Sequence, residues 1–352
     1  MERIQITVFG PVNSGKSTLV NALCGQEVSL VSPIPGTTTD PVRKAIELPY
    51  GIGPAVIVDT AGLDDVSILG AERIRRTQQV IDTTDIAIVL GGEEPATKAL
   101  LEQLDGIPVV PYAQGESVDG LLQRIAAVLP EEKNHFLTGS LIHEGSVVLL
   151  VMPQDSEAPK GRLILPQVQV LRELLDRGCI PVCCTPEKLP DALRATKPDL
   201  VITDSQAFAT VNESIPSTTP LTSFSILLAA AKGDIEVFAE GARAISRLPD
   251  HARILIAEAC THVPDTEDIG RVKIPALLRK RMADLTVDVA AGNDFPEDLS
   301  PYSLVIHCGA CVASARLLRV RIKKALRAGV PITNYGMAIA FLQGILERVS
   351  LP

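Results

Sequence analysis

The stretch Gly10-Pro-Val-Asn-Ser-Gly-Lys-Ser17 constrains the fold of this 352-residue chain more than any other feature. It fits the pattern G-x-x-x-x-G-K-[ST], with an apolar run at 4–9 before it and a helical pattern after it. In this pattern backbone N–H groups wrap phosphates, Lys16 neutralises the β and γ charges, and the Ser17 hydroxyl binds Mg²⁺. The sequence therefore predicts a strand, a phosphate-binding loop and a helix that together bind a nucleotide.

Short apolar runs alternate with helical patterns along the whole chain, which is typical of parallel sheets with crossover helices. A polar stretch at 130–134 and loops rich in Ser, Thr and Pro near 214–220 interrupt this rhythm. We therefore predict an α/β protein of three domains, each with a mainly parallel sheet, at 1–132, 133–220 and 221–352. Strands are predicted at 4–9, 55–58, 86–90, 107–110, 147–152, 180–184, 200–203, 253–257, 285–289 and 304–306, and helices from 16, at 70–81, 166–177 and 312–328.

Composition limits the class of protein further. The net charge of -9 argues against a general affinity for nucleic acid, because a phosphate backbone needs a basic face. We find no apolar run of membrane-spanning length and no signal-peptide pattern, so we expect a cytoplasmic protein without membrane contact. Seven cysteines are an odd number, and three of them fall in two short clusters, so a disulfide framework is not expected.

Two further segments fit a nucleotide switch. Asp59-Thr-Ala-Gly62 follows the predicted strand at 55–58, where a carboxylate reaches Mg²⁺ through water and a glycine N–H can sense the γ-phosphate. Gly36-Thr-Thr-Thr-Asp40 lies between this segment and the phosphate-binding loop, where a loop can supply a Thr to the metal. Together these residues resemble the TrmE and Era branch of small GTPases.

This resemblance implies specific roles. Thr38 would close over Mg²⁺, and Asn13 would be a K⁺ ligand, because it stands three residues after Gly10 at the family's own spacing. Leu63 stands where Ras-like proteins carry a catalytic Gln, so slow, cation-assisted GTP hydrolysis is implied. The predicted catalytic residues are Lys16, Thr38, Asp59 and Gly62, and the predicted GTP and Mg²⁺ contacts are Gly10, Asn13, Ser14, Gly15, Lys16, Ser17, Thr18, Thr38 and Asp59.

The chain departs from that branch in one motif. The guanine-reading tetrad Asn-Lys-x-Asp is absent, and the nearest string, Thr97-Lys-Ala-Leu100, lacks the carboxylate that would pair with the guanine edge. The sheet of the first domain is therefore expected to have lost one strand and helix, and base specificity stays open. Tyr112-Ala113 is a candidate to replace the Ser-Ala loop that usually backs the base.

Two clusters of cysteine and histidine mark the last third of the chain. Cys260-Thr-His262 is followed, after residues 263–306, by His307-Cys-Gly-Ala-Cys311, and both clusters come at the ends of apolar runs. The second cluster is predicted to turn at Gly309 and enter a helix whose N–H groups favour anionic thiolates. From the spacing, zinc and an iron-sulfur cluster fit equally well. Buried packing is the prediction for the remaining cysteines, which are Cys24, Cys179, Cys183 and Cys184.

These clusters behind a TrmE-like domain resemble the HydF family of [FeFe]-hydrogenase maturation GTPases. The resemblance also rests on longer runs at 158–169, 203–206, 221–226, 268–274 and 334–336. It implies a GTPase domain, a dimerisation domain and a domain that holds a [4Fe-4S] cluster. The ligands implied are Cys260, Cys308 and Cys311, with His262 and His307 as candidates for an exchangeable position.

The resemblance also implies partners. The protein would be a homodimeric scaffold and carrier that receives a diiron precursor from radical-SAM maturases and passes it to the [FeFe]-hydrogenase apoprotein. Two alternatives stay open beside it. One is a GTPase that acts on tRNA or ribosomes and carries a structural zinc, and the other keeps the carrier role but binds nucleotide weakly because the guanine tetrad is missing.

Overall fold

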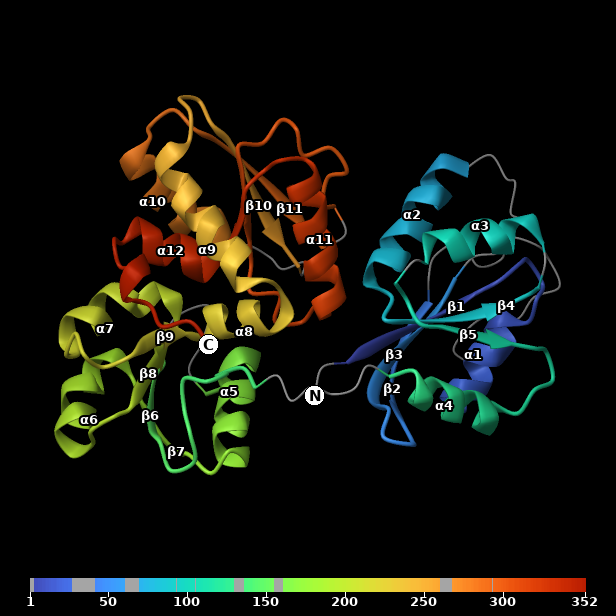
Figure 1. Cartoon of the computed structure of the whole chain (residues 1–352), viewed down its shortest axis with the longest axis horizontal. Helices are drawn as coiled ribbons and strands as arrows, with labels where there is room; N and C mark the ends of the chain where they lie inside the picture. Colours follow the sequence, from blue (N-terminus) through green and yellow to red (C-terminus); the bar gives the residue numbers. More distant parts are fainter. Residues whose placement is uncertain are drawn as a thin grey trace. The chain divides into compact units, whose positions relative to one another are not determined.

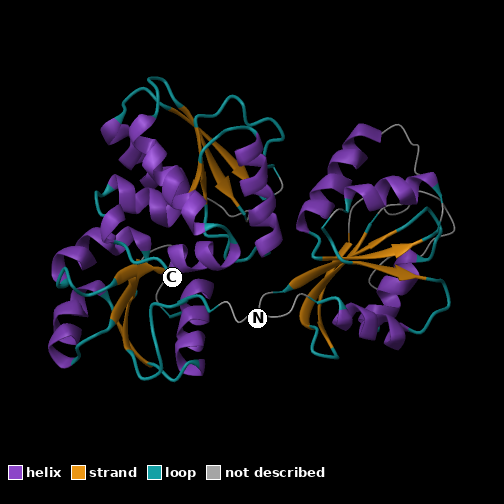
Figure 2. Cartoon of the chain, in the orientation of Figure 1, coloured by secondary structure: helices purple, strands orange, loops and turns teal. Residues whose placement is uncertain are grey.

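A computed structural model describes residues 3–26, 42–60, 70–92, 94–104, 106–129, 136–154, 161–259, 268–292 and 294–352. The chain divides into two units, residues 1–133 and 134–352. Its strands form three sheets with helices packed on them, which confirms the predicted α/β class and the mainly parallel sheets (Figure 2). In the described part of the chain no helix is long and apolar enough to cross a membrane.

The first unit contains a five-stranded sheet of order β2-β3-β1-β4-β5, in which only β2 runs antiparallel to its neighbour. Helices α1 and α4 cover one face and α2 and α3 the other, and each face has its own apolar core (Figure 1). The elements are β1 Ile4–Phe9, α1 Lys16–Cys24, β2 Val42–Leu48, β3 Gly53–Asp59, α2 Gly70–Thr83, β4 Ile86–Leu90, α3 Pro95–Gln103, β5 Val109–Tyr112 and α4 Val118–Ala127.

The second unit contains two four-stranded sheets, both parallel, of order β7-β6-β8-β9 and β11-β10-β12-β13. One continuous apolar core joins residues of both sheets. The elements of the first sheet are β6 Val147–Val151, α5 Leu165–Asp176, β7 Ile180–Cys184, α6 Leu189–Ala195, β8 Leu200–Thr203, α7 Phe208–Ser214 and β9 Leu221–Ser223. Those that follow are α8 Phe224–Lys232, α9 Ile235–Ala244, β10 Arg253–Glu258, α10 Ile274–Arg281, β11 Thr286–Ala291, β12 Leu304–His307, α11 Ala315–Arg327, β13 Ile332–Asn334 and α12 Tyr335–Leu342.

Three details differ from the sequence predictions. Strand β9 pairs with β8, so its sheet continues three residues beyond the boundary predicted at 220. Buried packing was predicted for all four remaining cysteines, and it holds for Cys24 and Cys179. It is wrong for Cys183, which is exposed because β7 is the edge strand of its sheet, and Cys184 is half-buried.

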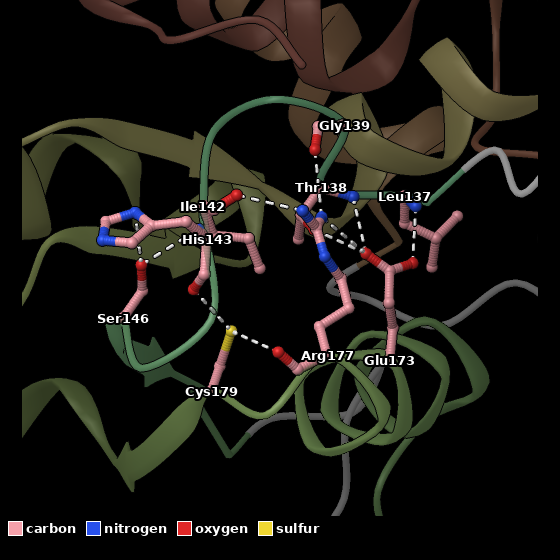
Figure 3. A network of polar contacts seen from close by, with 9 residues as sticks. All are labelled: Leu137, Thr138, Gly139, Ile142, His143, Ser146, Glu173, Arg177 and Cys179. Carbon is pink, nitrogen blue, oxygen red and sulfur yellow. Dashed lines mark hydrogen bonds and ion pairs between the residues drawn. The ribbon is translucent and has the colours of Figure 1, made fainter.

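A network of polar contacts fixes the start of the second unit to helix α5 (Figure 3). The Glu173 carboxylate accepts hydrogen bonds from the backbone N–H groups of Leu137 and Thr138, the latter at 2.9 Å. Arg177, one turn further along the helix, donates to the carbonyls of Gly139 and Ile142, each at 2.9 Å. Both side chains are largely buried, with 11% of Glu173 and 15% of Arg177 exposed. The segment 137–142 is therefore held through side chains of a helix more than 30 residues later.

Replacing Glu173 by alanine is expected to lower the free energy of unfolding of the second unit by about 2–4 kcal/mol, because two partly buried N–H groups would lose their acceptor and the Arg177 guanidinium would lose its ion-pair partner. Urea unfolding followed by circular dichroism measures the change. Asp176→Ala on the same helix is the matched control, since its ion pair with Arg172 is solvent-exposed and should contribute little. Equal stability of Glu173→Ala and wild type would contradict the role given to this network.

Candidate functional site

The phosphate-binding loop predicted from the sequence lies between β1 and α1. Gly15, with φ of 91°, is in the left-handed region and caps α1, and Asn13, with φ of 60°, is in the same region. The Lys16 ammonium is buried and donates to the carbonyls of Gly10 at 3.0 Å and Pro11 at 2.6 Å. The lysine thus lies across its own loop, where phosphate oxygens can take over from these carbonyls.

On the side of the loop where Mg²⁺ was predicted to bind, the start of helix α1 meets the end of strand β3. The Ser17 hydroxyl donates to Asp59 Oδ2 at 2.7 Å, and Asp59 is fully buried at the end of β3. Thr60 donates to the Val8 carbonyl at 2.7 Å, which ties the end of β3 to β1. The structure therefore brings Lys16, Ser17 and Asp59 together, while Thr38 and Gly62 lie outside the described residues.

Cys308 and Cys311 lie in a tight turn after β12. The Cys308 Sγ accepts N–H groups from Ala259 at 3.1 Å and from Ala310 at 3.4 Å. The turn was predicted to depend on Gly309, but the residue in the left-handed region is Ala310, with φ of 51°. Two N–H donors on one sulfur favour its thiolate form, because they stabilise negative charge there.

The predicted helix N-terminus at this turn is wrong. Helix α11 begins at Ala315, and the Ser314 side chain accepts the Leu317 N–H as its cap, so that group is not directed at the cysteines. A buried ammonium holds the turn instead. Lys232, at the end of α8, donates to the carbonyls of Ala310 at 2.9 Å and Ala313 at 2.8 Å. This places a positive charge beside the two thiols.

His307 lies away from the two thiols. It is fully buried at the end of β12, where Arg321 Nη1 donates to its Nε2 at 2.9 Å and its Nδ1 lies 2.7 Å from the Cys308 carbonyl. Burial, followed by the nearby Arg321 charge, lowers the pKa of His307 to about 3, so the ring is neutral and Nδ1 is the donor. With both ring nitrogens bonded to protein, the described structure does not present His307 as a ligand.

Arg321 connects the carboxyl edge of this sheet. It is 2% exposed and donates to the carbonyls of Glu258, at the end of β10, and Gly292, after β11, besides its bond to His307. One guanidinium therefore joins the ends of three adjacent strands. The residues that carry Cys308 are fixed relative to β10 and β11 through it.

A cavity of about 310 Å³ opens beside the two cysteines. Glu258, Cys308 and Tyr335 follow or end three adjacent strands of one sheet, and Asp204 and Ser225 follow two strands of the other, so the cavity lies between the carboxyl edges of both sheets. Carboxyl edges are where open α/β sheets place their ligands.

One wall of the cavity contains a hydroxyl that lacks a partner. Tyr335 Oη is buried and has no hydrogen-bond partner among the described residues. Burial raises the pKa of Tyr335 well above its ordinary value, so the group stays an O–H donor. A Cβ on Gly270 would overlap this hydroxyl, which explains the glycine. An unsatisfied buried donor costs about 1–3 kcal/mol, and an acceptor in the cavity would remove that cost.

Two carboxylates of the cavity wall lie near this hydroxyl. The Glu258 carboxylate, 2% exposed, is paired with Arg271 at 2.7 Å, and Asp268 accepts the Arg271 N–H at 2.7 Å. Cys260 and His262 lie outside the described residues. Within the described ranges no three His, Cys, Asp or Glu side chains are arranged to hold a metal ion. The two thiols, the N–H donors to Cys308 and the unpaired hydroxyl form a donor set of the kind that binds soft metal centres.

Sequence reasoning missed the residues that support this site. Neither Lys232 nor Arg321 was singled out from the sequence, and Tyr335 was included only as part of the run at 334–336. One signal for Lys232 was present in the sequence. It ends an otherwise apolar helix, Phe224–Lys232, which has no polar face where a lysine would be solvated. Nothing local in the sequence indicates that Arg321 turns inward, because its partners are 14 to 63 residues away.

Three family models match the chain and together cover most of it. Residues 5–112 match the 50S ribosome-binding GTPase family. Residues 137–233 match the hydrogen maturase F dimerization domain, and residues 236–352 match the hydrogen maturase F tetramerization domain. The two hydrogen maturase F models together span more than half of the chain. The first unit is thus a P-loop GTPase domain, and the second unit consists of domains named for oligomer formation.

Curated relatives match only part of the chain. The tRNA modification GTPase MnmE of Polynucleobacter asymbioticus is 42% identical over 106 residues, which are 29% of this chain and 23% of the relative. MnmE of Zymomonas mobilis is 31% identical over 181 residues, 50% of this chain and 40% of the relative. The chain therefore spans well under half the length of these relatives.

Solved GTPase structures resemble the chain weakly. Era of Aquifex aeolicus bound to GDP and aluminium fluoride aligns at 14% identity and a TM-score of 0.29, covering 84% of this chain and 97% of Era. The NFeoB protein of S. thermophilus bound to GDP, aluminium fluoride and K⁺ aligns at 18% identity and a TM-score of 0.22, over 36% of this chain and 64% of NFeoB. Likeness at this level carries no argument about function.

Proposed function

The chain belongs to the hydrogen maturase F (HydF) family, and on that premise we propose that it is a GTP-hydrolysing maturation factor for [FeFe]-hydrogenase. One observation carries the proposal. A P-loop GTPase domain and a cavity lined by Cys308, Cys311 and the unpaired Tyr335 hydroxyl occur in the same chain. A nucleotide switch joined to a sulfur-rich pocket is what a regulated carrier of a metal cargo requires.

The nucleotide site would work through residues on three segments. The proposed contacts to phosphate are the loop N–H groups and Lys16, and the proposed Mg²⁺ ligands are Ser17 directly, Thr38 from its loop and Asp59 through water. Asn13 is the proposed K⁺ ligand. In this arrangement Lys16 and a K⁺ ion on Asn13 would stabilise the negative charge on the β- and γ-phosphate oxygens as the γ-phosphoryl group passes to water and GDP leaves, and the Gly62 N–H would sense the γ-phosphate.

The cluster site would be formed by Cys260, Cys308 and Cys311. A [4Fe-4S] cluster on three thiolates keeps one iron open to an outside ligand. The Ala259 and Ala310 N–H groups stabilise the Cys308 thiolate, and Lys232 offsets the negative charge of the turn. The exchangeable ligand proposed is His262, since the two ring nitrogens of His307 are bonded elsewhere.

The cargo would be a diiron precursor received from radical-SAM maturases and passed to the hydrogenase apoprotein. The 310 Å³ cavity and the Tyr335 O–H donor offer it space and a hydrogen bond beside Cys308. We propose a GTPase part at 1–132, a dimerisation part from 133 that includes strand β9 and therefore extends to 223, and a cluster part at 224–352. Oligomer formation through the last two would set two or more cluster sites in one assembly.

Metal analysis of the full-length protein purified without oxygen tests the proposal most directly. We expect about four iron and four acid-labile sulfide per chain, with a broad visible absorption that disappears on oxidation. Hydrolysis of GTP, faster in K⁺ than in Na⁺, is expected of the same preparation. A colourless protein with one zinc per chain would contradict the cluster assignment, and no turnover of any nucleotide would contradict the GTPase assignment.

A tRNA-directed GTPase with a structural zinc is the second candidate, favoured by the 42% identity to MnmE. That match covers 29% of the chain, whereas the two hydrogen maturase F models cover residues 137–233 and 236–352. The acidic net charge of -9 also disfavours tRNA. Binding of tRNA that weakens steeply with salt, together with stoichiometric zinc, would favour this candidate over the first.

A further inference from the structure

A cavity of about 580 Å³ lies at the carboxyl ends of β4 and β5 in the first unit. Small-molecule sites typically measure roughly 300–1,000 Å³, so a nucleobase and ribose fit. Because β4 lies beside β1 in the sheet, the cavity adjoins the P-loop, and Ser14 of that loop is part of its wall. The opposite wall is the loop after β5, with Ala113, Gln114 and Glu116.

The loop after β5 reaches over the P-loop. Gln114 Nε2 lies 3.7 Å from the position of a Cβ on Gly15, so the amide side chain lies against the P-loop backbone. A nucleotide with its phosphates on the P-loop would therefore direct its base toward this loop. The sheet has no strand between β4 and β5 in the described part of the unit, so the β5 loop takes the position next to β4.

Glu116 is held firmly in this loop. Its Oε1 pairs with Arg124 Nη2 at 2.5 Å, and Arg124 Nη1 donates to the Pro111 carbonyl at 2.9 Å. The Tyr112 hydroxyl donates to the Glu116 carbonyl at 3.0 Å, and the Ala113 N–H donates to Glu116 Oε2 at 3.3 Å. A carboxylate has about four acceptor sites, so the contacts with Arg124 and Ala113 leave room for two more donors.

We propose that Glu116 reads the guanine edge in this chain, with Gln114 lying over the P-loop, so that Ala113-Gln-Gly-Glu116 takes the place of the missing Asn-Lys-x-Asp tetrad. The proposal rests on the nucleotide binding proposed above. Guanine carries two adjacent donors, N1–H and the N2 amino group, and one fixed carboxylate can accept both. Adenine offers the N1 lone pair and xanthine the O2 atom at the same positions, and both repel a carboxylate.

Titration calorimetry of wild type and Glu116→Gln with GDP, ADP and XDP tests this assignment without turnover. Wild type should prefer GDP strongly over ADP and XDP. Because hydrogen bonds to a charged group contribute about 1.5–3 kcal/mol, Glu116→Gln should bind GDP about 10- to 100-fold more weakly. The variant should bind XDP more tightly than wild type does, since an amide N–H can donate to O2. Its ADP affinity should be unchanged, which also shows that the site remains folded.

Glu94→Gln is the matched control. Glu94 lies near the cavity, but its carboxylate accepts the Gly92 N–H at 2.7 Å and is not part of the wall, so its change should leave the GDP preference intact. Equal GDP and ADP affinities in wild type, or an unchanged GDP affinity in Glu116→Gln, would overturn the inference and leave nucleotide binding standing. A parallel loss of GDP and ADP affinity in Glu116→Gln would mean that Glu116 only supports the loop through Arg124. That result would also overturn the inference that Glu116 reads guanine. Absence of any nucleotide binding by wild type would refute both this inference and the proposed GTPase.

Discussion

Lys16→Ala is expected to lower GTP turnover by about 10²- to 10³-fold, the loss typical when one preorganised donor to a developing charge is removed. The Lys16 ammonium is buried, and it donates to two carbonyls of its own loop. The ammonium is therefore fixed within the loop that is proposed to hold the phosphates. Phosphate release measured at saturating GTP in K⁺ buffer reports the change in turnover.

Lys98→Ala is the matched control for this experiment. Lys98 lies in the string Thr97-Lys-Ala-Leu100, the nearest sequence match to the missing guanine tetrad, but it is exposed on α3 and is not part of the wall of the base cavity. Turnover and GTP affinity should match wild type. A similar loss in both variants would indicate a general effect of lowered positive charge, and full turnover in Lys16→Ala would place hydrolysis elsewhere.

The sequence predicted the features that depend on near neighbours. The P-loop is a contiguous pattern, and the buried parallel strands are long apolar runs, so β1, β4, β6, β7 and β8 lie within one residue of their predicted limits. Strands β9 and β13 were missed because each has only three residues and follows a loop. Strand β2 was missed because it lies at the edge of its sheet. Its exposed positions alternate with less exposed ones, so Val42–Leu48 contains no continuous apolar run.

The contacts that support the candidate sites depend on residues far apart in the sequence. Lys232 reaches carbonyls 78 to 81 residues later, and Arg321 joins ends of three strands. A basic side chain on an amphipathic helix is ordinarily solvated, and only the tertiary fold decides otherwise. The same holds for Glu116, whose role appears only when β5 lies directly beside β4. Local patterns indicate the kind of chemistry, whereas the fold decides which side chains support it.

Cys308→Ser is expected to weaken binding of the cluster by at least 10- to 100-fold. Mutating a group that only hydrogen-bonds to a metal ligand already lowers metal affinity by about that factor, and Cys308 is proposed as a ligand itself. The serine hydroxyl keeps the shape of the turn but is not a soft anionic ligand at neutral pH. Cys183→Ser is the matched control, since that thiol is exposed on edge strand β7, in the other sheet of the unit. Iron, sulfide and visible absorption per chain, measured without oxygen, should fall in Cys308→Ser and stay at the wild-type level in Cys183→Ser.

GTP turnover in Cys308→Ser should persist, because the nucleotide site lies in the other unit. Retention of the full cluster in Cys308→Ser would remove this thiol from the ligand set, and equal loss in both variants would point to oxidation of surface thiols rather than to a site at the turn after β12.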